Sequence, residues 1–327
     1  MKREEEGENS LNGKIDSEHL VWADSAKVSR LVRALKGKRE SASLQTFPDA
    51  LPGFSPSNFA LCYLNETTST MDVAKWFLNS GSSASVGHEL RSIYDERLNS
   101  APNAVLVLSE TQRQGRGREG REWYSPEACG IYLTFGFRPP VHSLSMSGYS
   151  LAVGISLARM LTRLQLDVRL KWPNDVLVRE GVSGELRKVA GILVEVMSAG
   201  DKLTGMCTGI GLNLYHTDFP SALRATSLEQ VIGRRLDYAA VVAELASHYF
   251  EVLSHYFAHG FSSFHEEWKR YSIMSGRLVE ATQDGVISRF RVTDVDSEGR
   301  LIVASLEDGR LSVIQSGEVK LLDTTHD

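Results

Sequence analysis

The sequence predicts an α/β protein of the α+β type, in which a mixed, largely antiparallel sheet with packed helices precedes a small C-terminal β-barrel. Three observations predict this class. Apolar runs of strand length recur between residues 59 and 215, and two long segments carry apolar residues at helical spacing. Short alternating runs separated by Asp-Gly or Glu-Gly follow residue 275. We expect a polar extension at 1–57, an α/β domain at 58–270 and the β domain at 271–327.

Length and charge narrow the classes of protein. With 327 residues and 42% hydrophobic content, the chain can bury a substantial core. A formal net charge of −5 and a pI of about 6.0 argue against general nucleic-acid binding. Three distant cysteines indicate neither a disulfide framework nor a CxxC metal site. Without a signal peptide or an 18-residue apolar run, we expect a cytoplasmic protein that binds no membrane, although an organellar form made from a longer precursor stays possible.

The elements before residue 110 are predicted as follows. Residues 1–57 are polar and irregular except for a helical pattern at 25–36, which is too short for a winged helix-turn-helix, so we expect no DNA binding. Residues 59–64 and 104–108 are apolar runs that predict buried strands. Between them, residues 69–79 predict a short helix opened by a capping box, and the polar stretch 80–102 predicts an exposed linker around a short helical piece.

The remaining elements complete the two folded domains. A strand is expected at 130–137, a helix at 149–164, and antiparallel hairpins over 168–178, 189–197 and 202–215. A second long helix is expected at about 237–257. The C-terminal domain should contain strands at 277–282, 286–294, 301–305 and 311–322.

The stretch QRQGRGREGREW, residues 112–123, concentrates charge directly after a predicted buried strand. Its first ten positions hold four arginines and three glycines. Glycines let backbone N–H groups approach a ligand closely, and guanidinium groups bind phosphate or carboxylate through two parallel hydrogen bonds. The position between two strands favours a ligand-binding loop, while a solvated or RNA-binding tract is the alternative.

Four further strings each have a structural and a functional interpretation. KWPND at 171–175 is either a hairpin turn or a site in which Asp175 orients an amine or a Mg²⁺ ion. Lys188, at a strand end, could present an ammonium group to an anion. GIGLN at 209–213 is either a phosphate loop or a strand whose glycines permit close packing. STMD at 69–72 caps a helix or hydrogen-bonds a polar ligand.

In this order, STMD, ETQRQGRGREGREWYSP, LKWPNDVLV, KVAGILVEV and GIGLNL resemble the biotin protein ligase (holocarboxylase synthetase) family. The resemblance extends over about 58–323 and implies a mixed α/β catalytic domain that binds biotin and ATP, with an SH3-like C-terminal domain. It also implies two reactions, the first of which requires Mg²⁺. Biotin and ATP give biotinyl-5′-AMP and pyrophosphate, and a lysine of a biotin carboxyl carrier domain, such as that of acetyl-CoA carboxylase, then takes the biotinyl group.

The resemblance assigns roles by motif. Catalysis is expected from Lys188, Arg118 and Asp175, with Lys188 as the principal electrophilic catalyst and Asp175 positioning the acceptor lysine. The expected biotin-binding residues are Ser69, Thr70, Met71, Gln112, Gly115, Arg116, Gly117, Arg118, Lys188, Gly191 and Ile192, with Leu193 beside them. The expected nucleotide-binding residues are Arg116, Arg118, Arg121, Trp123, Asn174, Lys188 and Asn213. No fixed metal site is expected, because Mg²⁺ would arrive with ATP near Asn174 and Asp175.

Two departures and two alternatives accompany this resemblance. Met71 and Asp72 occupy positions where some members carry other polar residues, and the winged helix-turn-helix of some members has no counterpart in 1–57. A lipoate or octanoate protein ligase shares the core fold, but its Arg-Arg-rich segment with consecutive glycines and a histidine is not found in this chain. An RNA-binding protein without catalytic activity is the other alternative. We expect a monomer or a weak homodimer.

Overall fold

The computed structural model describes residues 21–22, 26–27, 29–31, 33–34, 59–79, 103–138, 146–181, 184–200, 202–215, 217–283, 286–315, 317 and 319–322. The predicted linker at 80–102 and most of the extension at 1–57 therefore lie outside the described residues. In the described parts of the chain, no helix is long and apolar enough to cross a membrane.

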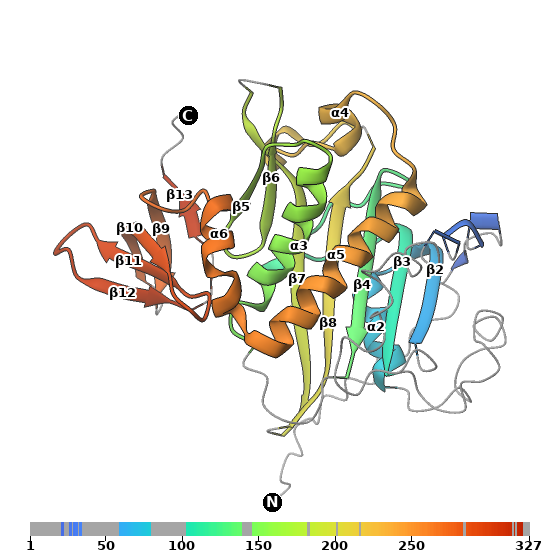
Figure 1. Cartoon of the computed structure of the whole chain (residues 1–327), viewed down its shortest axis with the longest axis horizontal. Coiled ribbons are helices and arrows are strands. Elements are labelled where there is room, and N and C mark those ends of the chain that lie inside the picture. Colours follow the sequence, from blue (N-terminus) through green and yellow to red (C-terminus); the bar gives the residue numbers. More distant parts are fainter. Residues whose placement is uncertain are drawn as a thin grey trace, which may run out of the picture.

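A large mixed sheet forms the centre of the molecule (Figure 1). Its strand order is β1-β2-β3-β4-β8-β7-β6-β5, and among the pairings between these described strands only β2 with β3 is parallel. The strands are β1 (Val21–Trp22), β2 (Phe59–Thr67), β3 (Ala104–Gln112), β4 (Gly130–Phe137), β5 (Val168–Lys171), β6 (Asp175–Arg179), β7 (Leu186–Ala199) and β8 (Lys202–Asn213). The mixed, largely antiparallel sheet is as predicted.

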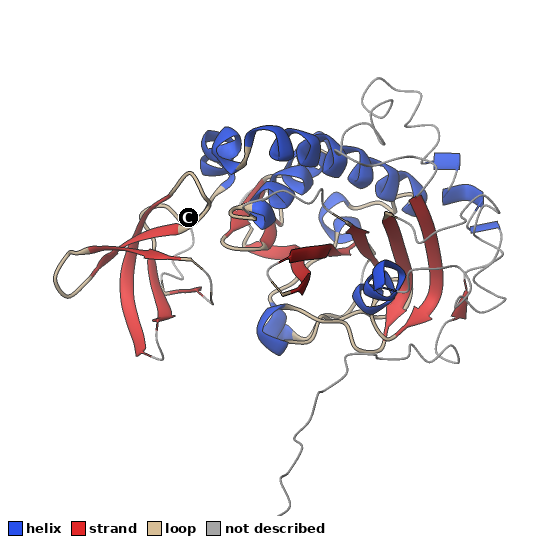
Figure 2. Ribbon diagram, turned by 90° about the horizontal axis from the view of Figure 1, so that it is seen from below, coloured by secondary structure: helices blue, strands red, loops and turns tan. Residues whose placement is uncertain are grey.

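Helices cover the two faces of this sheet unequally (Figure 2). The long helices α3 (Tyr149–Arg163) and α5 (Tyr238–His259) pack on one face, within the larger apolar core. The short helix α2 (Thr70–Asn79) packs on the other face, within a smaller core. Two shorter helices, α4 (Leu228–Ile232) and α6 (His265–Tyr271), complete the domain. Neither of the two long helices thus lies on the face that carries α2.

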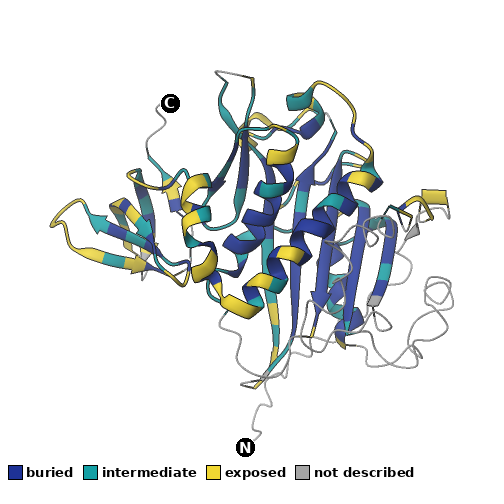
Figure 3. Cartoon of the chain, viewed as in Figure 1, coloured by how far each residue is buried: buried dark blue, intermediate teal, exposed yellow. Residues whose placement is uncertain are grey.

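The central strands of the large sheet are mostly buried along their length (Figure 3). All eight residues of β4 are buried, because this strand lies centrally and has apolar neighbours on both faces. Hydroxyl groups also link the long helices to the sheet: the hydroxyl of Tyr149 lies 2.9 Å from Thr208 Oγ1 on β8 and 2.7 Å from the hydroxyl of Tyr249 on α5. This buried network satisfies polar groups that would otherwise destabilise the core.

The C-terminal part is a five-stranded antiparallel sheet with the order β12-β11-β10-β9-β13. Its strands are β9 (Leu278–Gln283), β10 (Val286–Val295), β11 (Leu301–Ser305), β12 (Leu311–Ile314) and β13 (Val319–Leu321). The prediction of a single strand at 311–322 is therefore wrong. This segment contains two strands, β12 and β13, which lie at opposite edges of the sheet. The polar stretch Gln315-Ser316-Gly317-Glu318 separates the two strands, and its Ser-Gly pair is a turn signal that the prediction of one strand overlooked.

The structure also adds an element in the extension that the sequence pattern did not predict. Val21 and Trp22 form β1, which pairs with the otherwise free edge of β2, and described residues between 26 and 34 are helical. Leu31 of this segment is fully buried. Two residues of strand are too few to produce a detectable alternation, so periodicity could not reveal β1.

Candidate functional site

A cavity of about 410 Å³ opens on the face of the sheet that carries α2. It gathers residues from α2, the end of β3, the arginine-rich loop, the β5–β6 turn, β7 and β8. All but one of the predicted site residues line it: Ser69, Thr70, Met71, Gln112, Arg116, Gly117, Arg118, Arg121, Trp123, Asn174, Asp175, Lys188, Gly191, Ile192 and Asn213. Tertiary structure thus brings together motifs that lie more than 140 positions apart in the sequence.

The closed end of the cavity is formed where α2 meets the end of β3. Gln112 Oε1 accepts hydrogen bonds from the backbone N–H of Thr70 at 2.9 Å and from its hydroxyl at 3.1 Å. The Thr70 hydroxyl also lies 2.9 Å from Thr134 Oγ1 on β4. Ser69 Oγ accepts from the N–H of Met71 at 3.3 Å and so caps the helix. The carboxylate of Asp72, the other member of the predicted capping box, pairs with Arg116 instead. This end therefore offers several hydroxyl and amide groups held in fixed positions.

The arginine-rich loop is an ordered small hairpin rather than an open tract. Gly117 N–H donates to the carbonyl of Arg121 at 2.7 Å, and Trp123 N–H donates to the carbonyl of Gly115 at 2.9 Å. Gly115 does not line the cavity, because it is packed inside the hairpin. A Cβ at this position would lie 2.5 Å from Ser125 Oγ and 2.6 Å from the carbonyl of Trp123. This glycine is needed for close packing within the hairpin.

Trp123 lies on the sheet over two glycines. A Cβ on Gly211 would come within 2.3 Å of the indole, and a Cβ on Gly191 within 2.7 Å. The Nε1 atom of Trp123 is buried and has no hydrogen-bond partner among the described residues. Because a buried donor without a partner is costly, this N–H is suited to an acceptor on a ligand. The interpretation of 209–213 as a strand whose glycines permit close packing agrees with β8, whereas that segment forms no phosphate loop.

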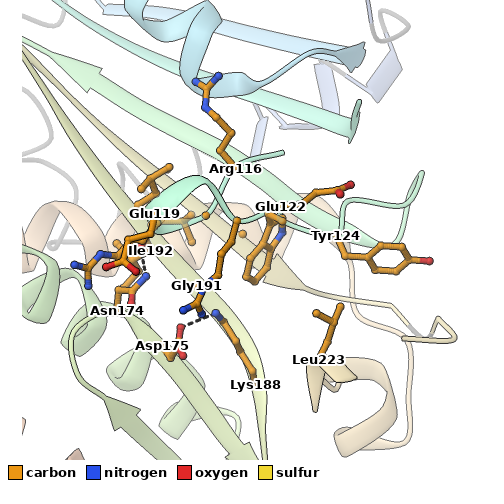
Figure 4. A pocket seen from close by; sticks show the side chains of 18 of the residues that line it. Arg116, Glu119, Glu122, Tyr124, Asn174, Asp175, Lys188, Gly191, Ile192 and Leu223 are labelled. Carbon is orange, nitrogen blue, oxygen red and sulfur yellow. Dashed lines mark hydrogen bonds and ion pairs between the residues drawn. The ribbon is translucent and has the colours of Figure 1, made fainter. Parts of the chain in front are cut away.

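Lys188 and Asp175 form an ion pair in the floor of the cavity. Lys188 Nζ on β7 lies 2.5 Å from Asp175 Oδ1 on β6 and 5.1 Å from the centroid of the Trp123 ring (Figure 4). Lys171, at the end of β5, lies 3.9 Å from the same carboxylate. Its pKa is lowered, chiefly because burial disfavours the charged form. One carboxylate therefore lies between two ammonium groups.

Two asparagines predicted to bind a nucleotide donate their side-chain amides to the backbone. Asn174 Nδ2 donates to the carbonyl of Ile192 at 2.8 Å, and Asn213 Nδ2 donates to the carbonyl of Thr226 at 3.0 Å. The backbone N–H of Ile192 in turn donates to the carbonyl of Asn174 at 3.0 Å. In this arrangement, the side-chain oxygens of the asparagines are the atoms left to meet a ligand.

The charge of the cavity contrasts with that of the chain. Among the described residues that line it, five are cationic (Arg116, Arg118, Arg121, Lys171 and Lys188) and three are anionic (Glu119, Glu122 and Asp175). Burial lowers the pKa of Arg118, while Glu119 and Asp175 act in the opposite direction. A guanidinium keeps its charge under such a shift because its ordinary pKa is above 12. The cavity is thus a local cationic site on an acidic protein, suited to an anionic ligand.

Some residues of the cavity were missed by sequence reasoning. Thr134 lies within an apolar strand, and Phe219, Ala222, Leu223 and Ala225 come from a segment after β8 that has no motif. Lys171 belongs to the KWPND string, but the sequence did not show that its ammonium group would face Asp175. These residues are brought to the cavity by strand register and by the path of a loop, which local patterns do not encode.

Two other kinds of chemistry find no support in the described part of the chain. No three His, Cys, Asp or Glu residues are grouped in a way that could hold a metal ion. Cys62 and Cys207 are buried, and burial raises the pKa of Cys207 to about 12, so its thiol stays protonated and unreactive at neutral pH.

Comparisons with known proteins agree with the sequence motifs. Residues 85–213 match the model of the biotin/lipoate A/B protein ligase family. The bifunctional ligase/repressor BirA of Bacillus subtilis is 28% identical over 247 residues, which cover 73% of this chain and 71% of that protein. The biotin–[acetyl-CoA-carboxylase] ligase of Paracoccus denitrificans is 28% identical over 219 residues, which cover 64% of this chain and 88% of that protein.

A solved structure shows the same fold. The biotin protein ligase from Aquifex aeolicus, determined in complex with biotin and ATP, superposes with a TM-score of 0.62 and 24% sequence identity, over 80% of this chain and 98% of that one. Residues 85–213 are therefore similar to the biotin/lipoate A/B protein ligase family, and the relatives of this chain include a biotin–[acetyl-CoA-carboxylase] ligase.

Proposed function

We propose that this protein is a biotin protein ligase that activates biotin with ATP and transfers it to a lysine of a biotin carboxyl carrier domain. The observation that carries the proposal is the convergence of all the family motifs on one cationic cavity. Its closed end has the hydroxyl and amide groups that a ureido ring would need, and its floor has the ammonium groups that reacting anions would need.

In the first reaction, a carboxylate oxygen of biotin attacks the α-phosphorus of ATP, and the bond to pyrophosphate breaks. Two anions must approach each other, so fixed cations lower the barrier. We assign this role to Lys188 and Arg118, which line the same cavity. The ammonium group of Lys188 has three N–H donors, and Asp175 takes one, so the remaining donors can meet the carboxylate and the α-phosphate.

In the second reaction, the acceptor amine attacks the acyl carbon of the adenylate, and AMP leaves. The amine arrives protonated at neutral pH and must lose a proton before it attacks. We assign Asp175 to orient this amine and to accept its proton. Between Lys171 and Lys188, the carboxylate has a second oxygen with which to receive an incoming ammonium group.

The nucleotide would lie against Trp123 and beside the side-chain oxygens of Asn174 and Asn213. Mg²⁺ is inferred to arrive with the triphosphate, since the described residues provide no carboxylate cluster of their own. When bound, the ion would neutralise phosphate charge.

The test is pyrophosphate exchange dependent on biotin and Mg·ATP, followed by transfer of labelled biotin to a carrier domain. Wild type should show both activities, and octanoate should not replace biotin. Lys188→Ala should reduce exchange by roughly 10²–10³-fold, the effect of removing one fixed donor to a developing charge. Its melting temperature should change little, because Lys188 is partly exposed.

The matched control is Arg113→Gln. Arg113 begins the same loop but pairs with Glu66 on β2 and does not line the cavity, so exchange should persist. A folded wild-type protein that shows neither exchange nor transfer would overturn the proposed function.

A further inference from the structure

The guanidinium of Arg116 is directed away from the floor of the cavity. Its Nη1 and Nη2 atoms donate to the two carboxylate oxygens of Asp72 on α2, at 2.9 Å and 2.5 Å. Figure 4 shows the side chain of Arg116 running from the loop toward α2, on the opposite side from Lys188 and Asp175. The hydrogen bonds to Asp72 are the main reason that the pKa of Arg116 is raised.

This pair joins two elements that both border the cavity. Asp72 lies in the first turn of α2, next to Met71 and two residues from Thr70, which binds Gln112 at the end of β3. Arg116 lies in one arm of the loop hairpin and is bridged to Glu122 in the other arm. The first turn of α2 is therefore tied to both ends of the segment 112–116, once through Thr70 and once through Asp72.

The geometry of the pair suits a positioning role. Two parallel N–H···O bonds fix both the distance and the orientation of a planar guanidinium, which a single contact does not. About a third of each side chain is exposed, so the pair can break without unfolding the core. The backbone of Gly115, Arg116 and Gly117 would then lose its connection to α2.

We infer that Asp72 is a positioning residue, which holds Arg116 and thereby keeps the loop 115–123 closed over the cavity. We call this pair the Asp72–Arg116 latch. Its consequence rests on the proposed function: the latch sets how long biotinyl-5′-AMP is retained before the acceptor arrives. A mixed anhydride reacts with water, so retention determines how much of it reaches the acceptor.

The opposite role for Arg116, direct binding of an anionic ligand group, makes the opposite prediction. Asp72 would then compete with the ligand for the guanidinium, and Asp72→Asn would free Arg116 and slow the release of the adenylate. If Asp72 holds the latch, Asp72→Asn speeds release by about tenfold, the factor equivalent to an interaction of ~1.4 kcal/mol. The sign of the change therefore distinguishes the two roles.

The release experiment measures dissociation of radiolabelled biotinyl-5′-AMP from the full-length protein. Asp72→Glu, which keeps a carboxylate, should restore most of the retention. Arg116→Gln should match Asp72→Asn, and the double variant should be no faster than either single variant, because both remove the same pair. Slower or unchanged release in Asp72→Asn, or additive effects in the double variant, would overturn the inference.

A matched control lies one turn further along α2. Lys75 pairs with Glu195 on β7 and does not line the cavity. Lys75→Gln removes an ion pair from the same helix but leaves the loop untouched, so it should release the adenylate at the wild-type rate. If this variant also released the adenylate faster, the acceleration would come from any change in α2, and a role specific to Asp72 would be contradicted.

Limited digestion with trypsin separates this inference from the proposed function, because it needs no catalysis. Cleavage after Arg116, Arg118 and Arg121, mapped by mass spectrometry without ligand, should be about tenfold faster in Asp72→Asn, whereas the melting temperature should stay near that of wild type. If wild type forms no adenylate, the proposed function fails, and this cleavage still decides whether the latch exists. Equal cleavage after Arg118 and Arg121 in wild type, Asp72→Asn and Arg116→Gln would exclude it.

Discussion

At the residue scale, glycine determines where Trp123 can lie. Strands β7 and β8 pair Gly191 with Gly211, so two positions without side chains face the indole from adjacent strands. Neither glycine has a positive φ, so both are required by space rather than by backbone conformation. The pair leaves room for a large aromatic ring on the sheet within the cavity.

The first residue-scale prediction concerns this contact. Gly211→Ala would place a Cβ 2.3 Å from the indole, and we expect it to lower the free energy of unfolding by about 1–3 kcal/mol, as overpacking does. In a Trp123→Ala background the same change should cost much less, because the obstructing ring is gone. Denaturant unfolding of the four proteins in this cycle provides the measurement. Equal costs in both backgrounds would show that Trp123 does not lie there.

At the element scale, the segment before β2 completes the edge of the large sheet. An exposed edge strand offers unpaired backbone groups to other chains, and pairing with β1 covers part of the β2 edge. The following helical residues are attached by the burial of Leu31 and by ion pairs of Lys27 with Glu110 and of Arg30 with Asp237. Glu110 also accepts from the hydroxyl of Tyr63 at 3.0 Å. The segment is thus anchored close to the end of β3.

We predict that Leu31→Ala detaches this segment. Truncating a fully buried leucine costs roughly 2–5 kcal/mol, which exceeds what the exposed ion pairs can offset. Tryptic cleavage after Arg30 should become faster, and light scattering should show association through the uncovered β2 edge. Arg33→Ala, a change at an exposed position of the same segment, serves as the control. Unchanged cleavage in Leu31→Ala would contradict this anchoring role.

At the scale of the whole molecule, the C-terminal sheet contacts the KWPND turn directly. The Nε1 atom of Trp172 donates to the carbonyl of Gly299 at 3.0 Å, and Lys269 pairs with Asp294 at 3.4 Å. Gly299 has a φ of +79°, and a Cβ there would lie 2.5 Å from the Cα of Gly148, just before α3. The turn that carries Asn174 and Asp175 is therefore supported from the second domain.

We predict that Gly299→Ala disturbs this contact and, with it, the proposed exchange activity. Gly309→Ala is the matched control, since Gly309 also has a positive φ, +72°, but open space around it. Both changes should cost about 1–2 kcal/mol of backbone strain. Only Gly299→Ala should also lower pyrophosphate exchange, because only its Cβ would separate the domains. Equal activity of the two variants would show that the contact does not support the site.

Elements with long, regular apolar patterns were predicted correctly from the sequence, and short elements were missed. Strand β4 and helices α3 and α5 were predicted within about two residues, because their apolar patterns are long and regular. The break between β12 and β13 was missed, and so was β1, because short strands lack a detectable period. For the candidate site, nearly every residue named from the motifs lines the cavity, but other lining residues, such as Thr134 and Leu223, were not predicted. The motifs also did not show which atoms pair.

The sequence by itself determined the fold class, the family resemblance and the motifs that meet at the candidate site, because these depend on local patterns and on motifs of fixed spacing. Only the tertiary structure decided how the charges of that site are arranged. Arg116 binds Asp72 rather than the floor of the cavity, and Asp175 lies between Lys171 and Lys188. The physical reason is that an ion pair depends on distances of a few ångströms between elements far apart in the chain, and these distances are set by strand register and packing.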